Sequence, residues 1–202
     1  MTRSALYLGG GAVVAGIAFY VRRLVVQNRA QTLAAQLQTL PRALAQWAEP
    51  IAAGAVATAP GDFPGGLEGW ARFGAAIMDR ESLGGEGSGY SPAGEWNGTG
   101  DGGHAVTPWQ LDRRYHARHL DRPDRSPASD SVYAFGLLAE RWRRFRSFGG
   151  DLALASTAAA YNASAQRVAD ALAAGADLAS IDSLTTGGNY GSDVLRRFGG
   201  LS

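Results

Sequence analysis

The hydrophobic pattern divides the chain into three parts. Residues 1–23 contain a long uncharged apolar run, residues 24–60 combine leucines at helical spacing with Ala, Gly and Pro, and residues 61–202 carry several apolar stripes at helical spacing. We therefore expect a transmembrane anchor over 1–23 and an amphipathic helix followed by a linker over 24–60. A single domain over 61–202 is long enough to bury a hydrophobic core.

The apolar run at residues 5–21 predicts a membrane anchor. Seventeen uncharged residues span about 25 Å as a helix, slightly less than a bilayer core of about 30 Å, and snorkelling arginines after the run can close the gap. A cleaved signal peptide and a buried core helix are the alternatives. Arg22, Arg23 and Arg29 outnumber Arg3, so the positive-inside rule favours a cytoplasmic position for the rest of the chain.

The segment that follows the apolar run predicts a helix and then a break. Leu33, Leu37, Leu40 and Leu44 share one face of a helix, which Pro41 should kink or split. The prolines and small residues after Trp47 indicate the linker.

The pattern beyond residue 61 indicates a mainly α domain of α+β type. Strand signals are scarce and are confined to short pieces between residues 83 and 112, a region that includes a long glycine-rich loop at 83–103. Asp130 is a plausible N-cap for the helix that follows it. Helical stripes are formed by Trp70, Phe73, Ile77 and Met78, and by Phe135, Leu138, Trp142 and Phe145, and further helices are expected around Tyr161 and after Tyr190.

Glu81 occupies an unusual place in the first of these stripes. One helical turn beyond Ile77, the stripe reaches Glu81, so a carboxyl group lies where the core expects an apolar side chain. Burial disfavours the charged form, which predicts a raised pKa and a proton held near neutrality. The alternative is that Glu81 faces solvent or pairs with Arg80.

Composition excludes several classes of chemistry. The chain of 202 residues has a formal net charge of +1 and no Cys, and all its basic residues apart from histidine are Arg. Disulfides, thiolate catalysis, Cys-ligated metals, a Walker lysine and Schiff-base chemistry are therefore impossible. Nine arginines between residues 113 and 146 favour an anionic polymer or a solvated surface over nucleic acid, because no nucleic-acid motif accompanies them.

The three histidines and two aspartates cluster between residues 101 and 119. His116 and His119 have a spacing that can ligate a metal, but no HExxH pattern is present, so hydrogen-bonding histidines are favoured. We expect no metal and no cofactor.

Five short motifs, in this order, resemble those of goose-type lysozymes and soluble lytic transglycosylases. The resemblance covers residues 68 to 198. The motifs are Arg80-Glu81-Ser82, Gly100-Asp101, Gln110-x-Asp112 followed by Arg113-Arg114-x-His116, Ala160-Tyr161-Asn162-Ala163, and Tyr190 with Asp193. The chain departs from the family at Thr107, Pro108 and Trp109, which replace Gly-Leu-Met, at a longer glycine-rich loop, and at Ser164, which replaces Gly.

The resemblance implies a lysozyme-like fold and roles for named residues. Glu81 would be the general acid, while Asp101 and Asp112 would position the attacking water. The expected substrate-binding residues are Ser82, His104, Trp109, Gln110, His116, Tyr161, Asn162 and Tyr190.

These inferences predict a muramidase that hydrolyses the β-1,4 bond between N-acetylmuramic acid and N-acetylglucosamine in peptidoglycan with inversion. The alternatives are a lytic transglycosylase that forms 1,6-anhydro products, a membrane-anchored structural protein that binds glycan without cleaving it, and a chitin-cleaving relative. Because a wall-cleaving domain in the cytoplasm has no substrate, we expect the protein in a phage virion membrane, with other virion or envelope proteins as partners. A bacterial inner-membrane anchor facing the periplasm is the second hypothesis.

Overall fold

The computed structural model describes residues 7–83, 99–100 and 103–201. This part of the chain is mainly helical, as predicted, and contains few strands. The elements are α1 (Tyr7–Leu37), α2 (Arg42–Ala45), α3 (Ala48–Thr58), α4 (Gly66–Ser82), β1 (Thr99–Gly100), β2 (Ala105–Val106), β3 (Leu111–Asp112), α5 (Arg113–Leu120), α6 (Pro127–Phe145), the 3-10 turn η3 (Arg146–Phe148), α7 (Gly150–Asn162), α8 (Ala165–Ala173), α9 (Leu178–Asp182) and α10 (Tyr190–Gly200).

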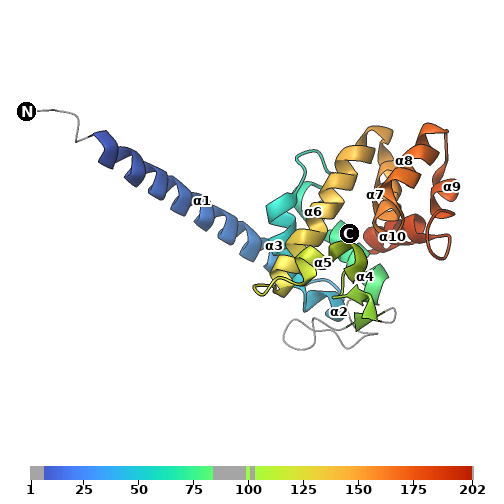
Figure 1. Cartoon of the computed structure of the whole chain (residues 1–202), viewed down its shortest axis with the longest axis horizontal. Coiled ribbons are helices and arrows are strands. Elements are labelled where there is room, and N and C mark those ends of the chain that lie inside the picture. The colour runs from blue at the N-terminus through green and yellow to red at the C-terminus, as the bar shows by residue number, and fades with distance from the viewer. Residues whose placement is uncertain (1–6, 84–98, 101–102, 202) are drawn as a thin grey trace, which may run out of the picture.

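The N-terminal helix α1 extends away from a compact helical body (Figure 1). It is continuous across the predicted boundary at residue 23 and ends at Leu37, before Pro41. Leu33, Leu37 and Leu44 are buried against the body, as their spacing predicts. In the described part of the chain, none of the helices combines the length and the apolarity that a bilayer crossing requires. The membrane anchor at residues 5–21 stays a prediction.

The predicted linker is wrong, because residues 48–58 form the buried helix α3. Ile51, Ala52 and Ala55 are fully buried, and α3 packs against α1, α4 and α6. Pro50 lies in the first turn of α3, where a backbone N–H has no intrahelical partner to lose. The small residues that suggested a flexible segment allow α3 to pack closely, so residue 61 marks no break in the hydrophobic core.

Phe135 of α6 lies at the centre of this core. Its ring packs against Trp70 and Trp109, with centroids 5.5 Å and 5.4 Å away. Gly54 of α3 and Gly74 of α4 face the same ring, and a Cβ atom at either position would lie less than 3.0 Å from it. Because Gly54 and Gly74 have no side chain, α3 and α4 can pack closely against α6.

The helix α6 begins differently from the prediction. Ser126 is the N-cap, and Ser126 and Ser129 form a reciprocal capping box, with Pro127 in the first turn. Asp130 lies inside the helix, is buried, and binds His119 at 2.8 Å and Arg125 at 3.1 Å. The predicted N-cap at Asp130 is wrong, because the side chains of Ser126 and Ser129 accept the hydrogen bonds from the backbone N–H groups at the start of α6. The Asp130 carboxylate forms buried ion pairs instead.

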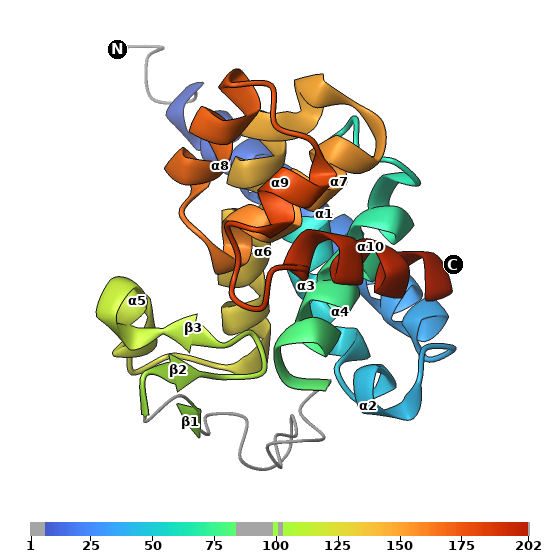
Figure 2. The ribbon, with the colours of Figure 1, turned by 90° about the vertical axis from the view of Figure 1, so that its right-hand side faces the viewer.

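A small antiparallel sheet, in the order β1-β2-β3, lies beside α5 on one side of the helical body, and α8 and α9 lie on the other (Figure 2). Ala105 pairs with Gly100 and with Asp112. Asp112, the last residue of β3, directly precedes the first residue of α5.

Candidate functional site

Glu81 lies in the last turn of α4. The apolar residues that precede it on the stripe, Trp70, Phe73 and Ile77, are fully buried, whereas Glu81 is partly buried. Leu83 adopts a left-handed conformation and ends the helix. The hydroxyl of Tyr190 donates a hydrogen bond to Oε1 of Glu81. The carboxyl group is therefore held in place at the edge of the core.

Burial raises the pKa of Glu81 from 4.5 to about 7. The hydrogen bond from Tyr190 and the charge of Arg80 act in the opposite direction but do not overcome desolvation. Arg80 forms its ion pair with Asp193, at 3.1 Å, instead of with Glu81. Glu81 can therefore hold a proton at neutral pH, which a general acid requires.

The position of Tyr190 depends on the N-terminus of α10. Asp182 is buried and accepts hydrogen bonds from the backbone N–H groups of Gly191, at 2.6 Å, and Ser192. A Cβ atom at Gly191 would lie 2.8 Å from the Asp182 carboxylate, so glycine is required for this approach. The hydrogen bonds to Asp182 fix the N-terminus of α10. The ion pair between Arg80 of α4 and Asp193 of α10 links these two helices.

Glu81 opens onto a cleft of about 670 Å³. This volume is typical of sites that hold small organic ligands. The walls come from the end of α4, the strands β2 and β3, α5, α6, and the segment that joins α7 to α8. The lining residues are Glu81, Ala105, Gln110, Leu111, Asp112, Tyr115, His116, Leu137, Arg141, Tyr161, Asn162, Ala163, Ser164, Ala165 and Thr186.

Asp112 lines the same cleft as Glu81. It is the N-cap of α5 and accepts the backbone N–H of Arg114 at 2.8 Å. Both carboxylate oxygens also accept hydrogen bonds from the Arg114 guanidinium, and these bonds lower the pKa of Asp112. Asp112 is thus a stable carboxylate at neutral pH. The other predicted aspartate, Asp101, lies outside the described residues.

Four of the predicted substrate-binding residues line the cleft: Gln110, His116, Tyr161 and Asn162. His116 contacts the Tyr133 hydroxyl at 3.0 Å, and burial is the main cause that lowers its pKa. The hydroxyl of Tyr161 donates to the carbonyl oxygen of Trp109 at 2.8 Å, which joins α7 to the turn before β3.

The other four predicted substrate-binding residues do not line this cleft, and their role stays a prediction. Trp109 is buried, and its indole N–H donates to Ser131 at 3.1 Å, so it supports the cleft from the core. Ser82 is buried and its hydroxyl donates to the Met78 carbonyl of its own helix. Tyr190 is buried behind Glu81. His104 is exposed and, like these three, is not among the residues that line the cleft.

The turn that carries Gln110 is strained. Thr107, at the position where the resembling family has Gly, has a φ of 69°, and Gln110 has a φ of 49°. A left-handed conformation is costly for a β-branched residue such as Thr. Thr107 is fully buried, and the Gln110 backbone N–H and side-chain amide both donate to its carbonyl oxygen at 2.9 Å. The core and these bonds hold the turn that places Gln110 at the cleft.

Arg141 and Tyr115 were missed by sequence reasoning, although both line the cleft. Tyr115 is 79% exposed, which makes its ring accessible to a ligand. Arg141 is half-buried and is one of nine arginines between residues 113 and 146, and the sequence pattern did not indicate which of them faces the cleft. Tyr115 could have been predicted, because it lies inside the motif Arg113-Arg114-x-His116.

His116 and His119 both contact Tyr133, but only His119 also contacts a carboxylate among the described residues. The ring of His119 stacks on Tyr133, with centroids 4.0 Å apart, and bonds to Asp130. Within the described residues, no group of three or more His, Asp and Glu side chains is placed to hold a metal ion.

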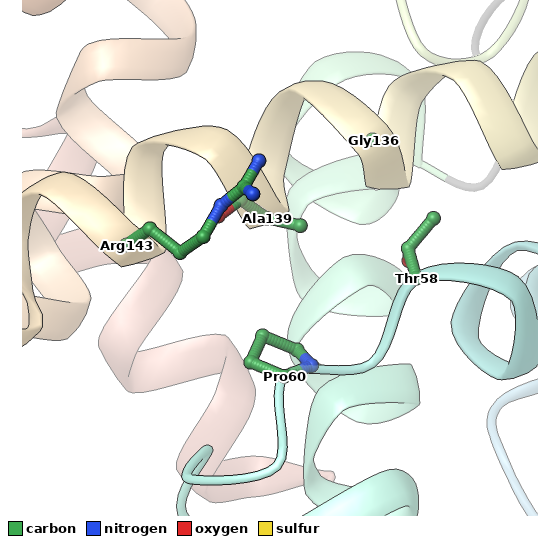
Figure 3. Close-up of a pocket in the computed structure, with 5 residues that line it drawn as sticks. All are labelled: Thr58, Pro60, Gly136, Ala139 and Arg143. Atoms are coloured by element: carbon green, nitrogen blue, oxygen red, sulfur yellow. The ribbon is translucent and has the colours of Figure 1, made fainter.

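A second hollow, of about 380 Å³, lies on another face of α6. Figure 3 shows that Arg143 and Ala139 of α6 line it, together with Thr58 and Pro60. It lacks a carboxyl group among its lining residues in the described part of the chain, so it offers no acid for catalysis.

No family model matches this sequence, and no curated protein matches it.

Proposed function

We propose that this protein cleaves the β-1,4 bond between N-acetylmuramic acid and N-acetylglucosamine in peptidoglycan, on a lysozyme-like fold, with Glu81 as general acid. The observation that carries this proposal is a carboxyl group whose pKa is raised to about 7 by burial and which faces a cleft of about 670 Å³. The motif resemblance described above supports the same residue.

In the proposed reaction, protonated Glu81 donates its proton to the glycosidic oxygen while an oxocarbenium-like transition state develops. The Tyr190 hydroxyl keeps the Glu81 carboxyl group in position throughout. In an inverting hydrolase, a second carboxylate on the opposite face of the sugar ring accepts a proton from the water that attacks the anomeric carbon as the glycosidic bond breaks. Asp112 fits this requirement by charge and by its place in the cleft.

A specific observation also favours lytic transglycosylase chemistry as a second candidate. The Arg114 guanidinium engages both oxygens of Asp112 and lowers its pKa, which makes Asp112 a weaker base. If Asp112 does not act as the base, Glu81, having given its proton to the leaving-group oxygen, can accept the proton of the muramic acid 6-hydroxyl while that hydroxyl attacks the anomeric carbon and closes a 1,6-anhydro ring. The glycan is then cleaved without uptake of water.

Product analysis of the full chain tests the proposal. Purified peptidoglycan is digested and the muropeptides are identified by mass spectrometry. Products that have gained water indicate hydrolysis, and 1,6-anhydro ends indicate transglycosylation. Intact glycan strands after prolonged incubation of a folded protein would contradict both forms of the proposal.

We further propose that α1 attaches the protein to a membrane of a phage virion or of the bacterial envelope. Phe19, Tyr20 and Val21 are 51–70% exposed on α1 and are followed by Arg22 and Arg23. This arrangement is typical of an apolar segment that meets a charged membrane surface. Co-sedimentation of the full chain with liposomes, and its detection in purified particles, test the location.

A further inference from the structure

The cleft contains a cationic group that the proposed acid chemistry does not use. Arg141 of α6 lines the cleft together with Glu81, Tyr161 and His116. The charge that acts on the pKa of Glu81 is that of Arg80. Arg141 therefore requires a separate explanation.

The guanidinium of Arg141 is held in one orientation. Its Nε donates to the carbonyl oxygen of Ala160 at 2.7 Å, and its Nη1 donates to that of Leu137 at 2.9 Å. The same group lies over the ring of Tyr161, 5.8 Å from its centroid. These contacts connect α6 to α7 and fix the guanidinium before any ligand binds, which reduces the entropy that binding would cost.

The charge of Arg141 is not neutralised by an ion pair with any acidic side chain of the described residues. Burial lowers its pKa, which shows that the guanidinium has lost part of its hydration. Among the described residues, Glu140 favours the charged form of Arg141 but forms no ion pair with it, so a ligand carboxylate that reached this half-buried guanidinium would gain a charge-assisted contact.

We propose that Arg141 binds a carboxylate of the substrate, so that the cleft selects an acidic glycan over a neutral one. This inference rests on the proposed function, because it assigns the acidic group to peptidoglycan. An Arg guanidinium is planar and binds a carboxylate with two parallel N–H donors. Two sources in peptidoglycan carry this group: the lactyl ether of muramic acid where no peptide is attached, and the stem peptide where one is.

Binding measurements on full-length protein with the Glu81→Gln substitution test the proposal without cleavage of the ligand. Three tetrasaccharides are titrated by calorimetry: alternating glucosamine and muramic acid residues with free lactyl carboxylates, the same glycan with stem peptides, and neutral chitotetraose. Arg141→Met, which keeps the aliphatic stem, should weaken binding of the acidic ligands about 10-fold to 100-fold, the range for a hydrogen bond to a charged group. Binding of chitotetraose should stay within about twofold.

The pattern of losses identifies the source of the carboxylate. Loss with the free lactyl glycan alone assigns the lactyl group, and loss with the peptide-bearing glycan alone assigns the stem peptide. Equal loss with chitotetraose, or no loss with either acidic glycan, overturns the proposal. Binding of the acidic glycans should also weaken with added salt, and this salt dependence should be reduced in the Arg141→Met variant.

Arg143→Met provides a matched control, because residues two positions apart on a helix point about 200° apart. Arg143 faces the hollow beside Thr58 and Pro60 (Figure 3), so its loss should leave binding of all three ligands unchanged. Arg141→Lys is the second variant if Arg141→Met lowers the melting temperature strongly. It keeps the charge but lacks the planar fork, and unchanged affinity for both acidic glycans in a folded Arg141→Lys variant would overturn bidentate binding.

Failure of this proposal is distinguishable from failure of the proposed function. A wild-type chain that cleaves no glycan contradicts the enzymatic proposal, yet its preference for acidic over neutral tetrasaccharides can still be measured. Conversely, active protein with no such preference contradicts only the role of Arg141.

Discussion

Replacement of Glu81 by Gln should decrease activity and increase stability at the same time. Gln has nearly the same size as Glu, and its amide oxygen can still accept the hydrogen bond that Tyr190 donates to Glu81. What the substitution removes is the proton that the carboxyl group carries and the negative charge that remains when the proton leaves.

The expected change in stability follows from the raised pKa. A rise of the Glu81 pKa from 4.5 to about 7 in the folded chain corresponds to about 3 kcal/mol. Below pH 4.5 both the folded and the unfolded chain carry the proton, so the group contributes no difference. Between pH 4.5 and about 7 the unfolded chain loses its proton first, so the free energy of unfolding falls as the pH rises, and it levels off above pH 7.

The Glu81→Gln variant lacks this fall because it does not titrate. At pH 8 it should therefore be more stable than the wild type by up to about 3 kcal/mol, and at pH 4 the two should be nearly equal. Activity should fall at least about 100-fold, the lower range for a general acid, and activity of the wild type should decline above pH 7 as Glu81 loses its proton.

Urea unfolding at several pH values gives the free energy of unfolding, and clearing of wall fragments gives the activity. Glu49→Gln is the control, because Glu49 is exposed in the first turn of α3 and should change stability by no more than about 0.5 kcal/mol. A stability difference between the Glu81→Gln variant and the wild type that is the same at pH 4 and pH 8 would refute the desolvated carboxyl group. Full activity of the variant would refute its role as the acid.

Three further predictions concern the hydrogen bond to Glu81 and the packing of the hydrophobic core. Tyr190→Phe removes a hydrogen bond that lowers the pKa of Glu81, so the alkaline limb of the pH–activity profile should move to higher pH, and an unchanged limb would contradict the coupling. Gly74→Ala places a methyl group against the Phe135 ring and should lower the free energy of unfolding by about 1–3 kcal/mol in urea titrations, whereas a neutral effect would mean that the helices can separate without cost. A chain reduced to residues 61–202 lacks α3 and exposes the core residues that α3 covers. Thermal unfolding followed by circular dichroism should therefore show no cooperative transition. A sharp transition would contradict the conclusion that α3 is part of the core.

The periodic pattern of the sequence was sufficient for the local structure around the acid. The stripe through Trp70, Phe73 and Ile77 predicts a helix with one buried face, and simple continuation of that stripe places Glu81 at the edge of the core. The mainly helical composition followed from the same periodicity. These features depend on residues within a few turns of one another, and such short-range regularity can be recognised from the chain alone.

Prediction from the sequence was wrong where a residue type is compatible with two different local structures. Ala, Gly and Pro at residues 48–58 are typical of a linker, yet here they form a helix that needs small side chains to approach Phe135. Asp130 has a side chain that suits a helix cap, but Ser126 takes that role and Asp130 forms a buried ion pair. Composition cannot distinguish these cases, because the deciding partner is distant in the chain.

The sequence by itself determined the mainly helical class, the stripe that ends at Glu81, and the chemistry excluded by the absence of Cys and Lys. Only the tertiary structure decided which side chains surround Glu81. Tyr190, which begins the helix anchored by Asp182, donates its hydrogen bond to Glu81 from the buried side. Arg141 lines the same cleft, whereas Trp109 is buried. The reason is physical. A raised pKa and a cleft arise from desolvation and from contacts between segments far apart in the chain, and neither is a property of any local pattern.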